Sequence, residues 1–260
     1  MKTRGNIFRS LLPPVVVLIL AVAAMEIAAR MLNEPFLLPR PGAVALAMVD
    51  HRMDLAASLW TTTQATLIGF FASAVAGVAV AMILAAWPLA RRAIYPYTVF
   101  FQTVPIVAIA PLLVIWCGPG IGAVALSSFI VSVFPVIANT MAGLLSTDPA
   151  LEDLFRLYEA SPWARLWKLK LPSAMPSIFT GLRIAAGLAV IGTVVGEFLV
   201  GLFGPGEGLG VRIISAKKTG HTEIVFAAVL LASLLGLAMF AAINLAAKLL
   251  LRRWHAPEQN

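Results

Sequence analysis

The chain has 260 residues, of which 60% are hydrophobic and only 12% carry a charged side chain. A soluble domain is about half apolar with about a quarter charged residues, so this composition excludes a soluble globular protein and indicates an integral membrane protein. The formal net charge is +7, but no basic patch is interleaved with aromatic residues, which argues against a nucleic-acid partner. The single cysteine, Cys117, excludes an internal disulfide.

Apolar residues gather in blocks close to the ~20 residues that a helix needs to cross the hydrocarbon core of a bilayer. A transmembrane barrel would instead show many segments of ~10 residues with alternating polarity, and this pattern is absent from the sequence. The blocks predict an all-α membrane protein with six transmembrane helices, at about 11–32, 64–87, 95–116, 121–145, 177–201 and 224–251. No linker-rich stretch or internal repeat divides the chain, so 1–260 is predicted to be a single domain.

The first block follows Lys2, Arg4 and Arg9, as the apolar segment of a cleaved secretory signal also would. Here the apolar character continues to Leu32 and a Pro-Pro step opens the block, which favours a retained helix. With the N-terminus inside, thirteen Lys and Arg residues lie on the inner side and six on the outer side. This bias predicts that both termini and the 146–176 connection are cytoplasmic.

Two connections are predicted to lie outside. In the first, 33–63, Pro41 suits the first turn of a short surface helix. The second, about 202–223, is rich in glycine, but no Gly-Lys-Ser/Thr step follows, so it is not a phosphate-binding loop.

The 146–176 connection contains eight charged residues and therefore cannot cross the bilayer. Asp148-Pro149 and Ser161-Pro162 are each a capping residue followed by proline, which predicts two short helices at 149–158 and 162–170. On the second helix, Trp163, Leu166 and Trp167 fall on one face. This face either docks on a partner protein or lies on the chain's own membrane helices.

This connection resembles the cytoplasmic signature of the permease subunits of ABC importers, in particular the nitrate, sulfonate and taurine group. That signature ends in Leu-Pro, 19 residues after its acidic position, so Pro172 is matched with Asp153 and not with Glu159. The match places Glu159 where the family has glycine, in a turn that favours a left-handed residue. Either Glu159 accepts that strain or the turn takes another geometry closed by Ser161-Pro162. The resemblance assigns these residues to an ATPase-coupling loop: Asp153, Leu154, Phe155, Glu159, Ala160, Ser161, Trp163, Leu166, Trp167, Leu169, Leu171 and Pro172.

The resemblance extends over about 33–254, through segments such as "QTVPIVAIAPLLVIWCGPG", "FPVIANTMAGLLSTDPAL" and "LPSAMPSIFTGLRIAAGLA". It implies the type I ABC importer permease fold, an inner-membrane location and no enzymatic activity or cofactor on this chain. The implied partners are a second permease copy in a homodimer, two ATP-binding subunits that hold ATP and Mg²⁺, and an external solute-binding protein. Within the family, the segments "FRLYEASPWARLWKLKLP" and "FPVIANT" lean toward the members for pyrimidine precursors of thiamine or for riboflavin.

Polar residues inside the predicted spans are candidates for the translocation pathway, because buried polar groups in a membrane are costly. Helix–helix hydrogen bonding is the alternative for Ser128, Ser132 and Asn139 in the fourth span, and a simple proline kink is the alternative for the third span. Glu197 either neutralises a cation or pairs with Lys217 or Lys218, and the pair is favoured. The candidates are Gln102, Thr103, Ser128, Ser132, Asn139 and Glu197.

Two other classes compete with an ATP-driven permease. A secondary transporter or channel would not need a protruding aromatic hairpin and would more often carry buried charges for ion coupling. A membrane-embedded enzyme is disfavoured because the spans contain no cluster of His, Asp, Glu or Cys.

Overall fold

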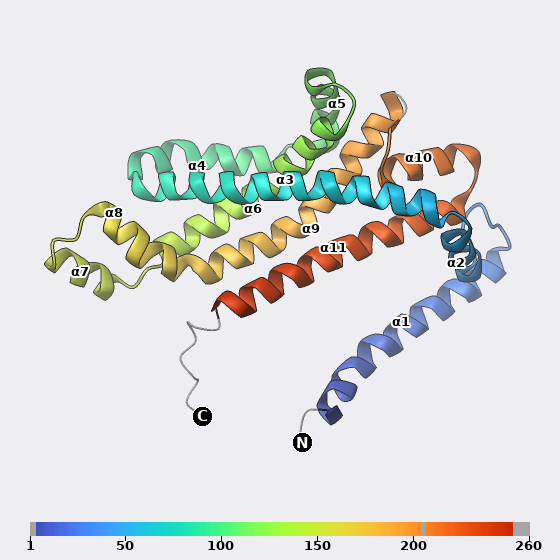
Figure 1. Cartoon of the computed structure of the whole chain (residues 1–260), viewed down its shortest axis with the longest axis horizontal. Coiled ribbons are helices and arrows are strands. Elements are labelled where there is room, and N and C mark those ends of the chain that lie inside the picture. Colours follow the sequence, from blue (N-terminus) through green and yellow to red (C-terminus); the bar gives the residue numbers. More distant parts are fainter. Residues whose placement is uncertain (1–3, 204–205, 252–260) are drawn as a thin grey trace.

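A computed structural model of the chain describes residues 4–203 and 206–251, and all regular structure in these residues is helical (Figure 1). The helices are α1 (Arg4–Leu32), α2 (Pro41–Asp50), α3 (Arg52–Ala86), α4 (Pro88–Thr103), α5 (Ile106–Cys117), α6 (Ile121–Leu145), α7 (Pro149–Leu157), α8 (Pro162–Arg165), α9 (Leu171–Phe203), α10 (Leu209–Thr219) and α11 (Thr222–Leu251). A single π-helical turn, Leu166–Lys170, joins α8 to α9.

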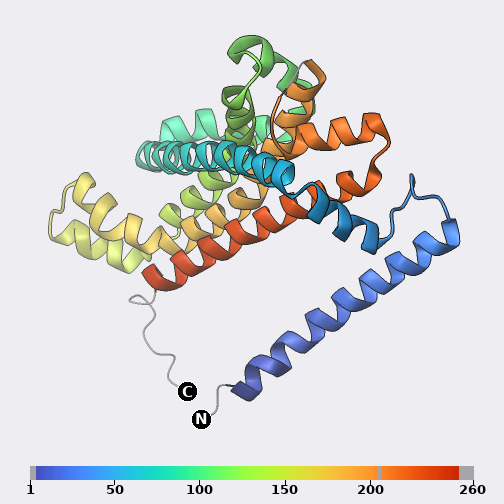
Figure 2. The ribbon, with the colours of Figure 1, turned by 45° about the vertical axis from the view of Figure 1, so that its right-hand side comes forward.

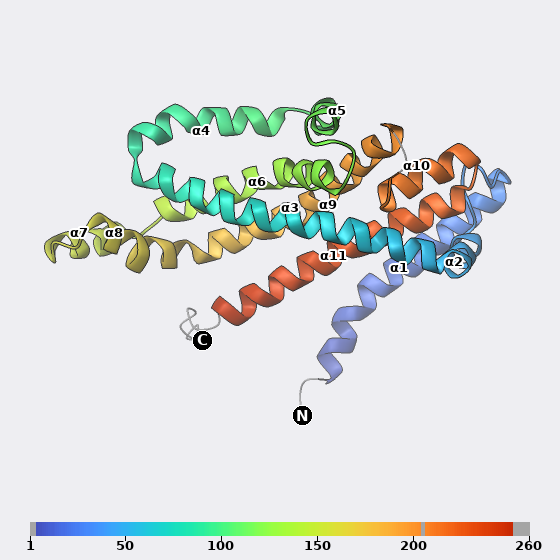
Figure 3. The ribbon, with the colours of Figure 1, turned by 45° about the horizontal axis from the view of Figure 1, so that its top comes forward.

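Within the described residues, five helical segments are long and apolar enough to cross a membrane: Leu12–Leu32, Arg52–Ala86, Ile121–Leu145, Pro162–Leu202 and Thr222–Leu251. These correspond to five of the six predicted blocks. The prediction of one continuous helix at 95–116 is wrong. Helix α4 ends at Thr103 and α5 begins at Ile106, because Pro105 has no N–H to continue the hydrogen-bond ladder. Figure 3 shows α4 running beside α3 and α5 turned away from it.

Helices α3, α6 and α9 form the centre of the bundle, and glycines set their contacts. A Cβ added to Gly69 of α3 would meet Ser128 of α6, and one added to Gly77 would meet Val136, so the two helices advance together and are parallel. On α9, Gly181 faces Asn139 of α6 and Gly192 faces Ser128, so α9 is antiparallel to α6. Small residues at these positions allow the backbones to approach closely.

The end of the bundle opposite the 146–176 connection carries the short helices α2 and α10. Helix α2 begins at Pro41, as predicted, and packs with α10 and α11 in one apolar cluster that contains Val44, Leu209 and Ala227. Helix α1 stands away from the bundle (Figure 2), and only 6% of its membrane-spanning window is buried. Of the charges that predicted the orientation, Lys2, Arg252 and Arg253 lie outside the described residues.

Candidate functional site

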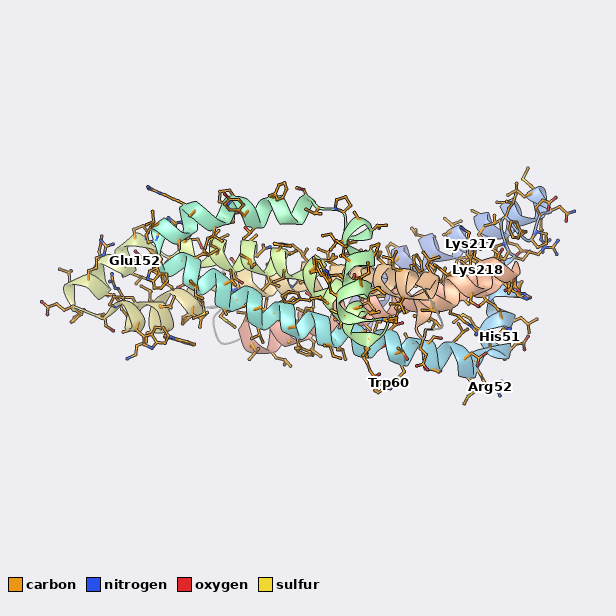
Figure 4. All side chains as sticks on the ribbon, turned by 90° about the horizontal axis from the view of Figure 1, so that it is seen from above. His51, Arg52, Trp60, Glu152, Lys217 and Lys218 are labelled. Atoms are coloured by element: carbon orange, nitrogen blue, oxygen red, sulfur yellow. The ribbon has the colours of Figure 1, made fainter. Side chains whose placement is uncertain are left out.

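The 146–176 connection folds as a helical hairpin at one end of the molecule, opposite Lys217 and Lys218 (Figure 4). Both predicted caps are formed. The side chain of Asp148 accepts a hydrogen bond of 2.9 Å from the N–H of Ala150, and that of Ser161 accepts one of 3.2 Å from Ala164. Each cap satisfies an N–H that would otherwise have no partner at a helix start.

Glu159 forms the turn between the two halves in a left-handed conformation, with φ of 50°. The N–H of Glu159 donates to the carbonyl of Arg156 at 2.9 Å, and the N–H of Ala160 donates to that of Phe155 at 3.0 Å. These two bonds are the Schellman pattern that ends many helices, usually with glycine in the left-handed position. Of the two alternatives for this turn, glutamate therefore takes the backbone conformation of the family's glycine.

The second half of the hairpin does not end before the membrane. The predicted helix at 162–170 and the predicted span at 177–201 are parts of one helical segment, Pro162–Leu202. The N–H of Leu171 bonds to the carbonyl of Leu166, five residues back, which makes the π turn. The wider turn precedes Pro172, whose ring would clash with the carbonyl four residues earlier in a regular helix.

The predicted apolar face of the second half is divided between the core and the surface. Leu166 and Leu169 are buried, and Leu166 belongs to the core formed with α3, α6 and α9. Trp163 and Trp167 remain 67% and 46% exposed and pack edge to face, with ring centroids 5.6 Å apart. The two tryptophans line a groove between the hairpin and the end of α3.

A salt bridge fastens the two halves of the hairpin together. The Nζ atom of Lys170 lies 2.5 Å from the Oε1 atom of Glu152 on α7, and each side chain is only 24% exposed. The hydrogen bond from Lys170 holds the pKa of the Glu152 carboxyl below its ordinary value, although partial burial acts in the opposite direction. The hairpin is therefore one unit and not two independent helices.

Sequence reasoning assigned Leu154 to the coupling loop but missed Leu157 and Tyr158, which complete the apolar tip of the hairpin. Leu154, Leu157 and Tyr158 are 45%, 81% and 79% exposed, and α7 lies at the end of the molecule (Figure 1). Their spacing of three and four residues was visible in the sequence, but the two tryptophans were the stronger signal. Of the remaining assigned residues, Asp153 is exposed, and its Oδ1 lies 3.8 Å from Arg156 Nη1.

The candidate pathway residues do not converge on one site. Ser128 and Ser132 are fully buried, and Ser128 donates to the carbonyl of Ala189 on α9 at 2.9 Å, which is the helix–helix bonding alternative. Asn139 donates to Pro135 within its own helix. Gln102 and Thr103 are exposed at the end of α4.

Glu197 is 1% exposed, and the predicted pair with Lys217 or Lys218 is wrong. Its carboxylate accepts hydrogen bonds of 2.8 Å from the Thr62 hydroxyl and 2.7 Å from the N–H of Gly210. The Thr62 oxygen also accepts a bond of 2.8 Å from the N–H of Leu209. Leu209 and Gly210 open α10, so Glu197 and Thr62 together cap this helix from two other helices.

Residues 73–255 match the family model described as binding-protein-dependent transport system inner membrane component. The chain belongs to this family. It is accordingly an inner-membrane permease subunit of an ABC importer for a small solute, and ATP hydrolysis belongs to separate subunits. The resemblance to the nitrate, sulfonate and taurine group is confirmed.

Two relatives of this permease cover most of its length. The formylaminopyrimidine transport permease protein ThiX of Halalkalibacterium halodurans is 37% identical over 238 residues, which are 90% of this chain and 92% of that protein. The taurine transport system permease protein TauC of Escherichia coli is 28% identical over 243 residues, which are 90% and 86% of the two chains. Among solved structures, an inward-facing form of the MetNI methionine ABC transporter aligns with a TM-score of 0.59 at 18% identity, covering 76% of this permease and 98% of that chain. That likeness concerns the fold.

Proposed function

We propose that this permease passes a small organic solute from an external binding protein across the membrane, and that two ATP-binding subunits drive it through the 146–176 hairpin. One observation carries the proposal: the second half of the exposed hairpin and the following span are one helical segment, Pro162–Leu202, and a salt bridge from Lys170 to Glu152 fastens the first half to it. A partner that moves the hairpin therefore moves a transmembrane helix directly. ATP and Mg²⁺ would be held by the partner subunits, and residues 1–260 would act as one domain.

The hairpin tip is the surface best suited to the ATP-binding subunit. Exposed apolar and aromatic side chains surrounded by charge are the usual anchors of protein interfaces. Leu157 and Tyr158 meet this description, with Asp153 and Arg156 beside them. Trp163 and Trp167, which the sequence favoured, face the groove next to α3, so we place them at the edge of the contact.

The finer topology is six crossings with both termini on the cytoplasmic side. Because α3 and α6 are parallel, the chain must return through the membrane between Ala86 and Ile121. Helices α4 and α5 have 16 and 12 residues, which at 1.5 Å per residue give about 42 Å of helix. That length is enough for one broken crossing of a hydrocarbon core of ~30 Å.

A second permease copy would complete the pathway. At the centre of the single bundle, the hydroxyls of Ser128 and Thr193 both donate to the carbonyl of Ala189, so these polar groups serve helix packing. A solute would then pass between two subunits, with domain movements opening the path alternately to each side. We propose a homodimer for this pair.

The solute is proposed to be a small heterocycle of the pyrimidine type. The support is the relative named for formylaminopyrimidine transport, which matches nearly the full length of this permease. ATP hydrolysis by the reconstituted assembly, measured with each candidate solute and its binding protein, would identify the substrate. Uptake by the permease alone, without ATP, would instead favour a secondary transporter.

The coupling proposal is tested by co-purification with the ATP-binding subunit. Replacing Leu157 and Tyr158 together by serine should weaken the complex about tenfold or more, since such anchors carry most of an interface. Replacing Phe36 and Leu37 by serine is the matched control, because these side chains are 63% and 62% exposed in the opposite connection. Equal complex yields for the two double variants would refute the assignment of the tip.

A further inference from the structure

A groove of about 1020 Å³ lies between the end of α3 and the hairpin. One wall is the face of α3 from Ala74 to Ala86, and every residue that it contributes is apolar. Val75 and Ile83 on this wall are 72% and 53% exposed. The helix rises about 18 Å from Ala74 to Ala86, close to the ~15 Å hydrocarbon depth of one leaflet.

The opposite wall, formed by the hairpin, combines apolar and aromatic residues with charged ones that are mostly basic. Arg156, Arg165 and Lys170 line it, with Glu152 as the one carboxylate in the lining. The Nζ atom of Lys170 lies 2.5 Å from Glu152, so these two charges compensate each other. The positive charges of Arg156 and Arg165 have no further carboxylate among the described lining residues to balance them. Asp153, 3.8 Å from Arg156, is highly exposed and does not line the groove. The wall therefore carries a net positive charge.

In this wall, the side chain of Arg165 has an N–H group without a hydrogen-bond acceptor in the part of the chain that the structure describes. Its Nε atom is buried and has no hydrogen-bond partner among the described residues. A buried N–H without an acceptor is unfavourable, and more so in a charged group, so an acceptor from outside the chain would stabilise this guanidinium. Trp87, Trp163 and Trp167 surround the same groove, and tryptophan is typical of the level of lipid headgroups.

We propose that this groove binds an anionic phospholipid of the cytoplasmic leaflet, with its phosphate at Arg165 and an acyl chain along α3. The apolar wall fits the chain, the basic wall fits the phosphate, and the tryptophans lie at the boundary between them. Basic pockets beside transmembrane helices on the cytoplasmic side are suited to anionic headgroups. The inference goes beyond the transport function but rests on the proposed cytoplasmic placement of the hairpin. A bound lipid would brace the hairpin against α3.

Native mass spectrometry of the purified full-length chain tests the proposal with two defined lipids, phosphatidylglycerol and phosphatidylcholine. The wild type should retain phosphatidylglycerol preferentially, and Arg165→Gln should lower that affinity about fivefold, as expected for one basic contact. Lys168→Gln is the matched control, because Lys168 is exposed on the same turn and does not line the groove. Ala79→Phe, which fills the apolar wall, should reduce retention of the lipid without removing a charge.

Equal retention of the two lipids, or equal effects of the Arg165 and Lys168 variants, would overturn the proposal. Displacement of the lipid when the ATP-binding subunit is added would assign the groove to that protein and overturn it also. Lipid retention is measured on the permease itself, so a failed complex with the ATP-binding subunit does not affect the reading. If Arg165→Gln does not fold, lipid retention by Ala79→Phe and Arg156→Gln is compared with that of Lys168→Gln instead.

Discussion

The carboxylate of Glu197 in α9 accepts a 2.7 Å hydrogen bond from the N–H of Gly210, at the second position of α10. The fit is close, because a Cβ on Gly208 would lie 2.2 Å from Oε1 of Glu197. A buried acid therefore serves as the cap of a helix that is separate from its own. This bond joins the C-terminal part of the membrane-spanning helix α9 to the first turn of α10.

Removal of this cap should destabilise the protein. Glu197→Ala leaves the buried N–H of Gly210 without an acceptor, at a cost of roughly 1–3 kcal/mol. The thermal midpoint in detergent should fall by about 2–4 °C per kcal/mol. Glu207→Ala is the control, since Glu207 is exposed in the same connection and its Oε2 atom is 3.4 Å from Thr61 Oγ1. Similar midpoints for the two alanine variants would contradict the capping role.

Replacing Glu159 by glycine should stabilise the hairpin. A non-glycine residue in the left-handed region costs ~1 kcal/mol, and glycine relieves this strain. The greater conformational freedom of glycine in the unfolded chain offsets part of the resulting gain in stability. We expect a net gain of about 0.5 kcal/mol and a higher thermal midpoint. Glu159→Val should be clearly destabilising, because branched side chains tolerate positive φ poorly. A lower midpoint for the glycine variant than for wild type would show that the turn has a different geometry.

The stabilisation from the salt bridge between Lys170 and Glu152 should decrease at low pH. The pKa of Glu152 is lowered from its ordinary value of 4.5, so the folded state favours the ionised form. The stabilisation is therefore present above pH 4.5 and is lost as the pH falls through the lower, folded-state pKa. The difference in thermal midpoint between wild type and Lys170→Gln should be constant from pH 7 to pH 5 and shrink below pH 4.5. A difference that disappears already near pH 6 would contradict this assignment.

A methyl group at the contact between α3 and α6 should separate these helices. In Gly69→Ala the new Cβ would lie 2.5 Å from Cβ of Ser128 and 2.6 Å from the carbonyl oxygen of Ala125, so at least one helix must shift. Overpacking of this kind costs about 1–3 kcal/mol. Gly122→Ala is the control, because no atom lies within 4 Å of its added Cβ. Equal decreases in thermal midpoint for Gly69→Ala and Gly122→Ala would show that α3 and α6 are not closely packed at Gly69.

The six-crossing topology predicts which cysteines a membrane-impermeant reagent can label. Cys117 is the single cysteine, it is exposed at the end of α5, and the proposed topology puts it on the outer side. Intact cells should label it from outside. Ser161→Cys in a Cys117→Ala background should react only in inverted vesicles. Labelling of Ser161→Cys from outside would reverse the orientation and with it the coupling proposal.

Features set by neighbours in the sequence could be predicted from the sequence, and those set by contacts between distant segments could not. The caps at Asp148 and Ser161 need only a side chain and the next turn of backbone, and both were predicted. The partners of Glu197 are the Thr62 hydroxyl and the N–H of Gly210, which belong to two other helices that the sequence alone does not bring near. Lysine residues in the same connection were the plausible alternative from charge alone, but they lie at the far end of α10.

Prolines in the sequence indicate where a regular helix is interrupted, but they do not indicate whether the helix ends or continues. Pro105 stops one helix and lets another begin at a new angle, whereas Pro172 is accommodated by a π turn in a continuous helix. Both residues lack an N–H and block the regular ladder in the same way. Which outcome follows depends on packing. Leu166 and Leu169 anchor the region before Pro172 in the core, while the residues around Pro105 are largely exposed.

The helical segment from Pro162 to Leu202 has 41 residues and is thus about 60 Å long, with Trp163 near one end and Glu197 near the other. Under the proposed coupling, a tilt imposed at the hairpin end would be delivered at the Glu197 end as a pull on the first turn of α10. The π turn before Pro172 departs from the regular hydrogen-bond ladder, so its stiffness would set how much of that tilt reaches α10.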